Sequence, residues 1–306
     1  MGESDKPGVL IADPRMRGYA AGLSDLFTMA DEPADDVIAV ISGPQGIVDA
    51  ALIARLPKLR LIATPAAGLD GIDLKAAAAR GVTVTNGGDV HSDDVANHAV
   101  ALALAARQQI VAGDSVVRGG GWRGDKMPPI RRSIAGDRIG IVGMGNIGRA
   151  VAARMAAFTP EIGWWGPRPH DHPWPRHESL RALADWCSIL IVCARGDNDN
   201  AGLIGAEIID AIGAEGLFVN ISRGHLVDED ALIDALKTGR LGGAALDVFA
   251  REPTEPARWE GVPNTTFTPH SAGMTHEAFA ALAALVISNV RSLLTGGELR
   301  NIVTPG

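Results

Sequence analysis

The sequence is poor in aromatic residues, in cysteine and in runs of positive charge, and the last two shortages each exclude a class of protein. Only 4% of its 306 residues are aromatic and 2 are cysteine, which excludes a disulfide-rich scaffold. Lys and Arg total 28 against 36 Asp and Glu, a net charge of -8, and no basic run is longer than the pair Arg131 and Arg132. Proteins that bind nucleic acid carry a basic surface, so nucleic acid is not an expected partner.

Neither a membrane span nor a metal centre is expected. No segment reaches the roughly 18 uninterrupted apolar residues that a membrane-crossing helix needs, and residues 1–7 are polar, unlike a signal peptide. We therefore expect a soluble, cytoplasmic protein. Cys187 and Cys193 lie in an apolar stretch, where inert buried thiols are expected rather than a disulfide or metal ligands. No spacing of His, Cys, Asp and Glu is typical of a metal site, and no Gly-x-Ser-x-Gly motif is present.

Small and aliphatic residues are abundant, with 46% hydrophobic residues and 37 glycines. Short apolar runs recur along the chain and alternate with segments of helical periodicity, which is the pattern of a parallel sheet. In the first part of the chain the expected strands are 9–12, 37–41, 59–64 and 82–85, with helices at 48–55 and 74–80. In the second part the expected strands are 138–143, 162–165, 189–193, 217–221, 244–248 and 265–268.

Two long apolar segments connect these sets of strands. Residues 93–118 carry apolar side chains at helical spacing and predict one long connecting helix, and residues 277–294 predict another that returns the chain to the first set. We expect an α/β protein with two Rossmann-like, doubly wound parallel-sheet domains and a cleft between them. A discontinuous, flavodoxin-like substrate-binding domain would comprise 1–97 and 276–306. A dinucleotide-binding Rossmann domain would comprise 98–275.

The best-defined motif is a glycine-rich turn between strand 138–143 and an expected helix at 149–158, with the sequence Gly143-Met144-Gly145-Asn146-Ile147-Gly148. In G-x-G-x-x-G the first glycine permits a tight turn, and the second lets the backbone approach a pyrophosphate. The third lets helix and strand pack closely, and the start of the helix supplies N–H donors. A chance match is the alternative in a glycine-rich chain, but the strand and helix on either side indicate a dinucleotide site.

The end of the second strand of this unit bears on which dinucleotide is bound. NAD sites place Asp or Glu about 20 residues after the glycines, but here strand 162–165 runs into Gly166-Pro167-Arg168. Without a carboxylate at this point a 2′-phosphate is not repelled, and Arg168 can pair with it. NADP(H) is therefore favoured over NAD(H). The alternative is that Arg168 is simply solvated in a loop.

Three more polar segments follow predicted strands, where open α/β sheets place their ligand sites. Arg223 offers a planar fork that can bridge the carboxylate and carbonyl oxygens of a 2-keto acid, and His270 can donate a proton to the forming alkoxide. Glu252, if paired with the imidazole, favours its protonated form and fixes its tautomer. Singly, each residue has an ordinary structural explanation as part of a turn, a helix boundary or a loop cap. Together, in this order and after strands, they favour a catalytic site, and their chemistry fits the reduction of a 2-keto acid.

The order of these motifs resembles the D-isomer-specific 2-hydroxyacid dehydrogenase family, over nearly the whole chain from the segment 68–73 to the last helix. It looks most like the glyoxylate/hydroxypyruvate reductase branch. The resemblance implies that Arg223, Glu252 and His270 are catalytic, and that Arg223 and His270 also contact the substrate. It implies that the backbone N–H groups of Ala67 and Gly68 hold the substrate carboxylate. It also implies a cofactor site that includes Cys193, Ala194, Ile221, Ser222, Asp247 and Ala272, with Asp247 on the nicotinamide carboxamide.

Some residues depart from the family pattern or have no expected role. Asn97 stands where members commonly carry an acidic residue, and no catalytic role follows from this change. Arg168 stands one place later than the usual family arginine, which keeps NAD(H) open as the cofactor. His91 and His98 lie near the connecting helix, where core or surface histidines are expected rather than ligands.

The expected function is reduction of glyoxylate or hydroxypyruvate to the 2-hydroxy acid, in the D form where the product is chiral, with NADPH. One alternative is an NAD-dependent dehydrogenase of another substrate, such as 3-phosphoglycerate or an aromatic keto acid. Segment 64–67 offers no cation for a substrate phosphate. A second alternative is a dinucleotide-responsive, corepressor-like binding protein. Segment 93–118 and the following arm with Trp122 resemble the dimer-forming segment of relatives, so a homodimer is expected; burial of this helix within its own chain is the alternative.

Overall fold

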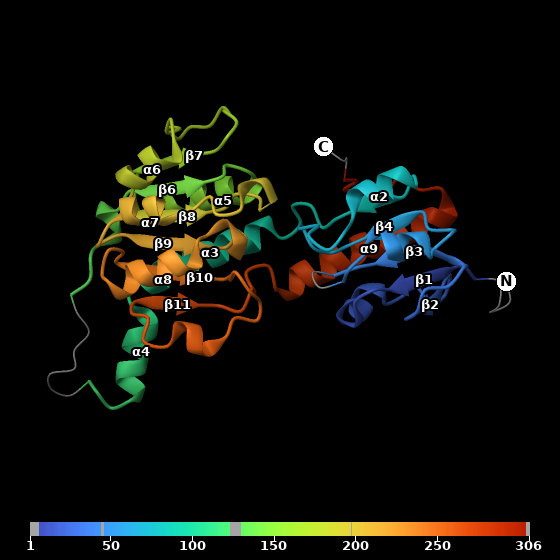
Figure 1. The fold of residues 1–306 in the computed structure, drawn as a ribbon, viewed down its shortest axis with the longest axis horizontal. Helices are drawn as coiled ribbons and strands as arrows, with labels where there is room; N and C mark the ends of the chain where they lie inside the picture. The colour runs from blue at the N-terminus through green and yellow to red at the C-terminus, as the bar shows by residue number, and fades with distance from the viewer. Residues whose placement is uncertain (1–5, 44–45, 123–129, 197, 304–306) are drawn as a thin grey trace. The chain divides into compact units, whose positions relative to one another are not determined.

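The computed structural model of the protein describes residues 6–43, 46–122, 130–196 and 198–303. The chain divides into two compact units (Figure 1), unit 1 with residues 1–91 and 274–306 and unit 2 with residues 92–273. The boundaries that the sequence predicts, after 97 and after 275, lie a few residues from these. The predicted architecture of two doubly wound, parallel-sheet α/β units is confirmed.

A five-stranded parallel sheet forms the centre of unit 1, in the order β2-β1-β3-β4-β5. Its strands are β1 (Gly8–Ile11), β2 (Thr28–Ala30), β3 (Val37–Ile41), β4 (Leu61–Ala63) and β5 (Thr83–Thr85). The order reverses between β1 and β3, as in flavodoxin-like folds. Four of the strands are predicted from their buried apolar runs. Sequence reasoning does not find β2, because this edge strand has three residues and none of them is fully buried.

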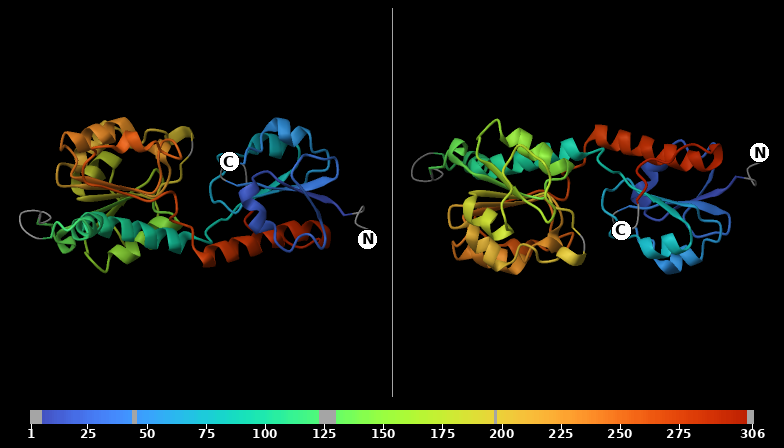
Figure 2. Two further views of the ribbon diagram at one scale, coloured as in Figure 1. Left: turned by 90° about the horizontal axis from the view of Figure 1, so that it is seen from below. Right: turned by 90° about the horizontal axis from the view of Figure 1, so that it is seen from above.

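Helices cover both faces of this sheet. The short helices α1 (Ala50–Ala54) and α2 (Leu74–Ala79) lie on one face, and the 3-10 helix η2 (Pro14–Ala20) and α9 (His276–Thr295) on the other (Figure 2). By length and composition alone α9 is apolar enough to cross a membrane. However, Val286 and Val290 on α9 pack with strand residues in the core of unit 1, which makes α9 a core helix of this unit.

Unit 2 is built on a six-stranded parallel sheet in the order β11-β10-β9-β8-β6-β7. Its strands are β6 (Ile139–Val142), β7 (Ile162–Trp165), β8 (Ile189–Val192), β9 (Leu217–Asn220), β10 (Gly243–Leu246) and β11 (Thr265–Phe267). Each of the six strands that the sequence predicts here is confirmed. Strands β6 to β10 are almost fully buried and read as continuous apolar runs. The edge strand β11 is only partly buried. The order reverses between β6 and β8, the point at which doubly wound sheets bind ligands.

The helices of unit 2 are α3 (Ser92–Arg107), α4 (Ile110–Arg118), α5 (Asn146–Met155), α6 (Leu180–Trp186), α7 (Ala206–Ile212) and α8 (Glu229–Lys237). Helices α3 and α5 pack on one face of the sheet, and α6, α7 and α8 pack on the other. Short 3-10 helices lie in the connections: η3 (Ile134–Gly136), η4 (Asn198–Asn200), η5 (Gly224–Leu226) and η6 (Pro256–Trp259).

The prediction of one long helix over 93–118 is wrong. Gln109 adopts the left-handed conformation, with φ 51° and ψ 39°, and separates α3 from α4. The two helices are bent by 59° at this point. The Nη1 atom of Arg131 donates to the carbonyl oxygen of Gln108 at 2.7 Å, which satisfies a carbonyl at the end of α3 from outside the helix. The sequence shows no Gly or Pro at this break, so helical periodicity alone continues through it.

Candidate active site

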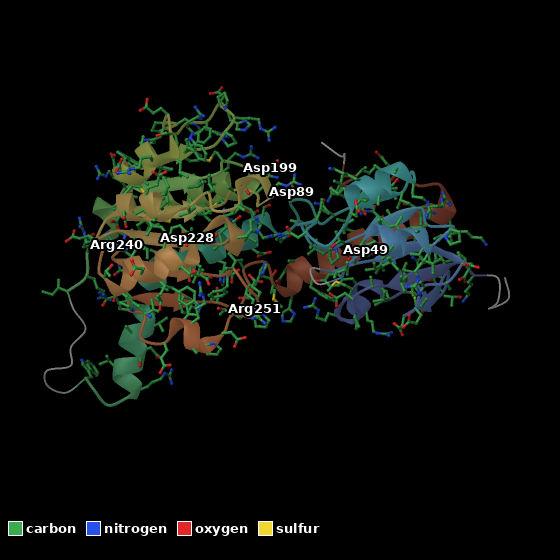
Figure 3. All side chains as sticks on the ribbon, in the orientation of Figure 1. Asp49, Asp89, Asp199, Asp228, Arg240 and Arg251 are labelled. Carbon is green, nitrogen blue, oxygen red and sulfur yellow. The ribbon has the colours of Figure 1, made fainter. Side chains whose placement is uncertain are left out.

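The six strands of unit 2 are parallel, so their carboxyl ends lie at one edge of the sheet. Every ligand-binding residue predicted in unit 2 follows one of these strand ends. In order of the strands they are the turn 143–148 after β6, Gly166, Pro167 and Arg168 after β7, Cys193 and Ala194 after β8, Ile221, Ser222 and Arg223 after β9, Asp247 and Glu252 after β10, and His270 and Ala272 after β11. In Figure 3, Arg251 marks the loop after β10, and Arg240, just before β10, marks the opposite edge.

The glycine-rich turn after β6 has the geometry of an anion-binding loop. Gly143 has φ 92°, and a Cβ atom there would lie 2.6 Å from the Cα atom of Ala194. A Cβ atom at Gly148 would lie 2.0 Å from the carbonyl oxygen of Gly143, so both positions require glycine. A Cβ atom at Gly145, by contrast, would meet nothing within 4 Å, and no side chain caps the first turn of α5. The backbone N–H groups at this helix start can therefore bind a dinucleotide pyrophosphate.

Two arginines lie near the end of β7. Arg168 is exposed in the loop after the strand. Arg176 is brought back to the strand end, because the amide of Trp164 donates to the carbonyl oxygen of Pro175 at 3.1 Å. There Nη2 of Arg176 donates to the carbonyl oxygen of Gly166 at 2.8 Å, and its guanidinium lies 5.8 Å from the centre of the Trp164 ring. Sequence reasoning missed Arg176, since only the folding back of the loop places it beside Gly166.

The turn that carries Arg223 is held by side chains that are themselves buried. The Nδ2 atom of Asn220 donates to the carbonyl oxygen of Arg223 at 3.0 Å, and its Oδ1 atom accepts from the amide of Ser222 at 3.0 Å. Asn220 is 1% exposed. The hydroxyl of Ser222 donates to the carbonyl oxygen of Ala194, which ties the ends of β8 and β9 together. Asn220 therefore determines the position of the Arg223 backbone, a role that its place at the end of a predicted strand did not reveal.

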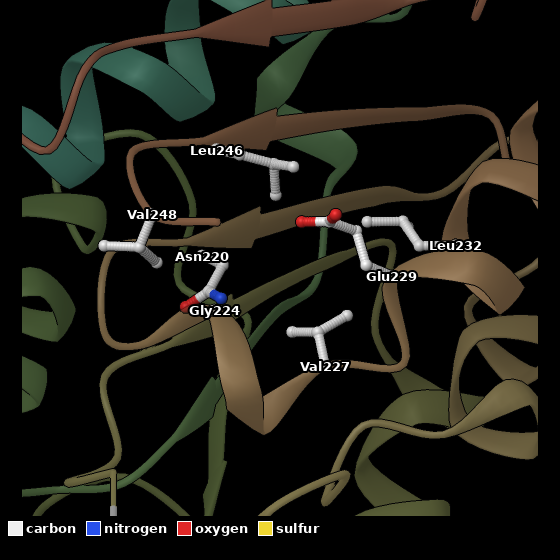
Figure 4. A pocket seen from close by; sticks show the side chains of 7 residues that line it. All are labelled: Asn220, Gly224, Val227, Glu229, Leu232, Leu246 and Val248. Atoms are coloured by element: carbon white, nitrogen blue, oxygen red, sulfur yellow. The ribbon is translucent and has the colours of Figure 1, made fainter. Parts of the chain in front are cut away.

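Gly224 locks the Arg223 turn against the loop that carries Glu252. A Cβ atom at Gly224 would lie 1.9 Å from the carbonyl carbon of Phe249, so only glycine allows this close approach. The carboxylate of Glu229, 7% exposed, accepts from the amide of Ala250 at 2.9 Å. Figure 4 shows Glu229 among the apolar side chains beneath this loop. The pocket that these residues line has a volume of ≈ 0 Å³ accessible to water, so it cannot hold a ligand. Its residues pack tightly and support the loop that carries Glu252.

His270 and Glu252 form the central pair of the site. Nδ1 of His270 lies 2.6 Å from Oε2 of Glu252, whose other oxygen accepts from the amide of Phe249 at 3.1 Å. Burial alone would raise the pKa of Glu252, but the hydrogen bonds from His270 and Phe249 and the nearby charges of His270 and Arg223 lower it overall. The imidazole is 45% exposed, so its other nitrogen can reach a ligand. The structure thus brings together the three predicted catalytic residues.

Asp247 lies beneath the loop that carries His270, and its side chain is 1% exposed. Its carboxylate accepts from the hydroxyl of Thr268 at 2.6 Å and from the amides of Ser271 at 2.9 Å and Ala272 at 3.1 Å. The contacts seen for Asp247 therefore hold the loop 268–272. Its role toward nicotinamide stays a prediction.

Ala67 and Gly68 belong to unit 1, in the loop after β4. The loop is fixed from outside, since Nδ2 of Asn86 donates to the carbonyl oxygen of Ala67 at 2.9 Å and the amide of Gly87 donates to that of Ala66 at 2.9 Å. The backbone N–H groups of Ala67 and Gly68 have no hydrogen-bond acceptor among the described residues. They remain available to an anionic ligand such as a carboxylate.

A parallel sheet with this glycine-rich turn, and an Arg, a Glu and a His at the same edge, define a dinucleotide-dependent oxidoreductase. The family model of the D-isomer specific 2-hydroxyacid dehydrogenase, NAD binding domain, matches residues 100–272. The chain belongs to this family and is an NAD(P)-dependent 2-hydroxyacid dehydrogenase or reductase.

Relatives in this family cover almost the entire chain. A 2-ketogluconate reductase of Gluconobacter oxydans (strain 621H) is 34% identical, over 99% of this chain and 99% of the relative. A hydroxyphenylpyruvate reductase of Plectranthus scutellarioides is 39% identical, over 87% of this chain and 85% of the relative. The structure of an NADPH-dependent glyoxylate/hydroxypyruvate reductase of Sinorhizobium meliloti in complex with NADP and malonate has a TM-score of 0.90 at 29% identity. The match extends over 98% of this chain and 97% of the S. meliloti chain.

Proposed function

We propose that the protein reduces a small 2-keto acid, glyoxylate or hydroxypyruvate, to the 2-hydroxy acid with NADPH, giving the D form where the product is chiral. The observation that carries the reaction type is the contact of 2.6 Å between Nδ1 of His270 and Oε2 of Glu252, beside Arg223. The S. meliloti relative, named for NADPH and for these two substrates, supports the choice of cofactor and substrate.

The residues of the chain divide the work as follows. The dinucleotide, when bound on the turn 143–148 at the start of α5, supplies the hydride. Glu252 holds Nδ1 of His270, so Nε2 donates the proton to the substrate oxygen. The guanidinium of Arg223 binds the carboxylate and carbonyl oxygens of the substrate. The N–H groups of Ala67 and Gly68 bind the substrate carboxylate.

The preference for NADPH rests on the end of β7. Gly166 stands where NAD sites carry an acidic residue that binds the ribose hydroxyls. Without that carboxylate, a 2′-phosphate on the ribose is not repelled. Arg176 is hydrogen-bonded at this strand end and Arg168 lies in the following loop, which gives two cations for a phosphate. This extends the prediction made for Arg168 alone.

Steady-state kinetics with both cofactors test the proposal. The substrates are glyoxylate, hydroxypyruvate, 2-ketogluconate, 4-hydroxyphenylpyruvate and phosphohydroxypyruvate. We expect the highest kcat/KM for glyoxylate or hydroxypyruvate with NADPH. His270→Ala should lower kcat by about 10²- to 10⁴-fold, and Arg223→Ala should raise KM and lower kcat together. A clear preference for NADH or for another keto acid, or near-normal turnover by His270→Ala, would overturn the corresponding part. No turnover of any of these acids would overturn the choice of substrate.

We further propose that a second copy of the chain covers α4 in an isologous homodimer. α4 contains no buried residue, and in Figure 1 it projects away from the sheet of unit 2. Several large apolar residues on α4 and next to it are more than half exposed: Ile110, Val111, Val117, Trp122 and Ile130. Exposed apolar residues gathered in this way are typical of a protein interface.

A further inference from the structure

A chain of hydrogen bonds connects α3 to the loop that carries His270. Nε2 of His98 lies 2.9 Å from Oγ1 of Thr268, and the Thr268 hydroxyl donates to Oδ1 of Asp247 at 2.6 Å. A hydroxyl has one hydrogen, and a carboxylate only accepts. The hydrogen of Thr268 therefore goes to Asp247, and Nε2 of His98 must carry a hydrogen and donate to Thr268. The contact therefore requires a hydrogen on Nε2 of His98.

Asp247 connects Thr268 to the backbone around His270. Its carboxylate accepts from the amides of Ser271 and Ala272, and its carbonyl oxygen accepts from the amide of His270 at 2.7 Å. His270 has φ 51°, in the left-handed region. This conformation is unfavourable for a non-glycine residue and persists only where neighbours enforce it. The bonds to Asp247, together with the contact of 3.1 Å between the His270 amide and the carbonyl oxygen of Thr268, hold the backbone in it.

The network joins the two places where the chain passes between its units. The chain enters unit 2 after residue 91 and leaves it after residue 273. His98 lies shortly after the first passage, and Thr268 lies shortly before the second. Asp247 is 1% exposed and His98 is 25% exposed, and the contact between His98 and Thr268 is partly buried, where a hydrogen bond is stronger than in water.

We propose that His98 is a positioning residue for the catalytic acid. Acting through Thr268 and Asp247, it holds the loop 268–272 so that His270 keeps the orientation in which Glu252 binds its Nδ1 atom. This inference rests on the proposed role of His270. The expectation that His98 is a core or surface histidine and not a ligand agrees with this contact. The proposal adds that the contact positions the loop, which packing alone would not do.

Two substitutions at His98 separate these readings. His98→Leu keeps the bulk of the side chain and removes the donor, whereas His98→Gln places an amide N–H near the position of Nε2. We expect His98→Leu to lower kcat about tenfold, as loss of an outer hydrogen-bond partner does at other sites, with KM for NADPH within about twofold. His98→Gln should recover most of kcat. Equal impairment in both variants, or a change in KM alone, would overturn the proposal.

A double-mutant cycle tests the route through Thr268. Thr268→Val has nearly the same shape and removes the hydroxyl. If His98 acts through Thr268, the double variant His98→Leu with Thr268→Val should have the kcat of Thr268→Val alone, because both changes break one path. Multiplied effects would contradict this route. Thermal unfolding of each variant provides the check that the fold is retained.

A measurement on the protein without substrate makes the inference independent of the reaction assigned to it. The Nδ1 proton of His270, bonded to Glu252, should give a strongly downfield proton NMR signal in the wild type and in His98→Gln, and a shifted or exchange-broadened signal in His98→Leu. If the wild type reduces none of the keto acids, the proposed function fails while this signal still decides the inference. An unchanged signal in His98→Leu would overturn the inference even if turnover is high.

Discussion

Nδ1 of His270 lies 2.6 Å from Oε2 of Glu252, and the other oxygen of Glu252 accepts from the backbone of Phe249. The Gln side chain of Glu252→Gln has one oxygen and one NH₂ group, so either Nδ1 of His270 or the amide of Phe249 loses its acceptor. We expect kcat to fall about 10- to 100-fold, because the imidazole loses the carboxylate that orients it. Steady-state kinetics at saturating keto acid and cofactor measure this fall, and thermal unfolding checks that the fold is retained. A kcat equal to that of wild type would contradict the assignment.

The same substitution has a consequence for stability. The pKa of Glu252 is lowered in the folded protein from its usual value of 4.5. The ionised carboxylate therefore stabilises the fold at pH values above 4.5. This contribution is lost as the pH falls from 4.5 through the lowered pKa of the folded protein. Wild type should therefore be more stable than Glu252→Gln at about pH 6, and the difference in Tm should shrink below about pH 4.5. A difference that grows on acidification would show that the carboxylate is not the stabilising form.

Gly224 determines how closely the Arg223 turn approaches the Glu252 loop. In Gly224→Ala the new Cβ atom would start 1.9 Å from the carbonyl carbon of Phe249. We expect a loss of about 1–3 kcal/mol in the free energy of unfolding, and a fall in kcat because the Glu252 loop must move. Gly136→Ala is a matched control, since a Cβ atom there would meet nothing within 4 Å. The control should lie within about 0.5 kcal/mol of wild type in urea unfolding. Equal effects of the two changes would contradict the packing argument.

Most of the fold can be predicted from the sequence, because parallel strands buried on both faces have to be continuous apolar runs. What could not be predicted depends on contacts between distant residues. At the end of α3, the carbonyl oxygen of Gln108 accepts a hydrogen bond from the distant Arg131, and no local sequence pattern predicts this contact. β2 is an edge strand with no fully buried residue, so it has no apolar signal.

The candidate site divides in the same way. Arg223, Glu252 and His270 follow strand ends, and their chemistry is visible in the sequence. Arg176 and His98 are not found, because each reaches the site only through tertiary structure. For Arg176 it is the folding back of residues 175–177 along β7, and for His98 the packing of α3 beside Thr268.

The cofactor preference can be tested at the end of β7. We expect Arg176→Ala to raise KM for NADPH about 10- to 100-fold, the effect of losing a charge-assisted hydrogen bond, and to leave KM for NADH nearly unchanged. Arg168→Ala should act in the same direction. Gly166→Asp should reverse the preference by adding the missing carboxylate, since a Cβ atom there only touches the ring of Trp164 at 3.4 Å. Parallel changes for both cofactors would show that these residues do not contact the 2′-phosphate.

The two thiols should be inert in the folded protein. Burial raises the pKa of both Cys187 and Cys193 to about 12. The thiolate is the reactive form, and at about pH 8 only about one such thiol in ten thousand is ionised. We expect iodoacetamide to label neither cysteine in the native protein and both in urea, as measured by mass spectrometry. Cys193 is only partly buried, so rapid labelling of it in the native protein would contradict the raised pKa of its thiol.

Charge on α4 should separate the proposed dimer. Val117 and Trp122 are 57% and 68% exposed in the single chain, and a second copy would bury them. We expect wild type to have the mass of a dimer by size-exclusion chromatography with light scattering, and Val117→Glu to shift toward the monomer, because an unpaired charge is costly inside an interface. Ile47→Glu changes an equally exposed apolar residue of unit 1, 69% exposed, and should leave the mass unchanged. A monomeric wild type, or a dimer that withstands Val117→Glu, would place no interface on α4.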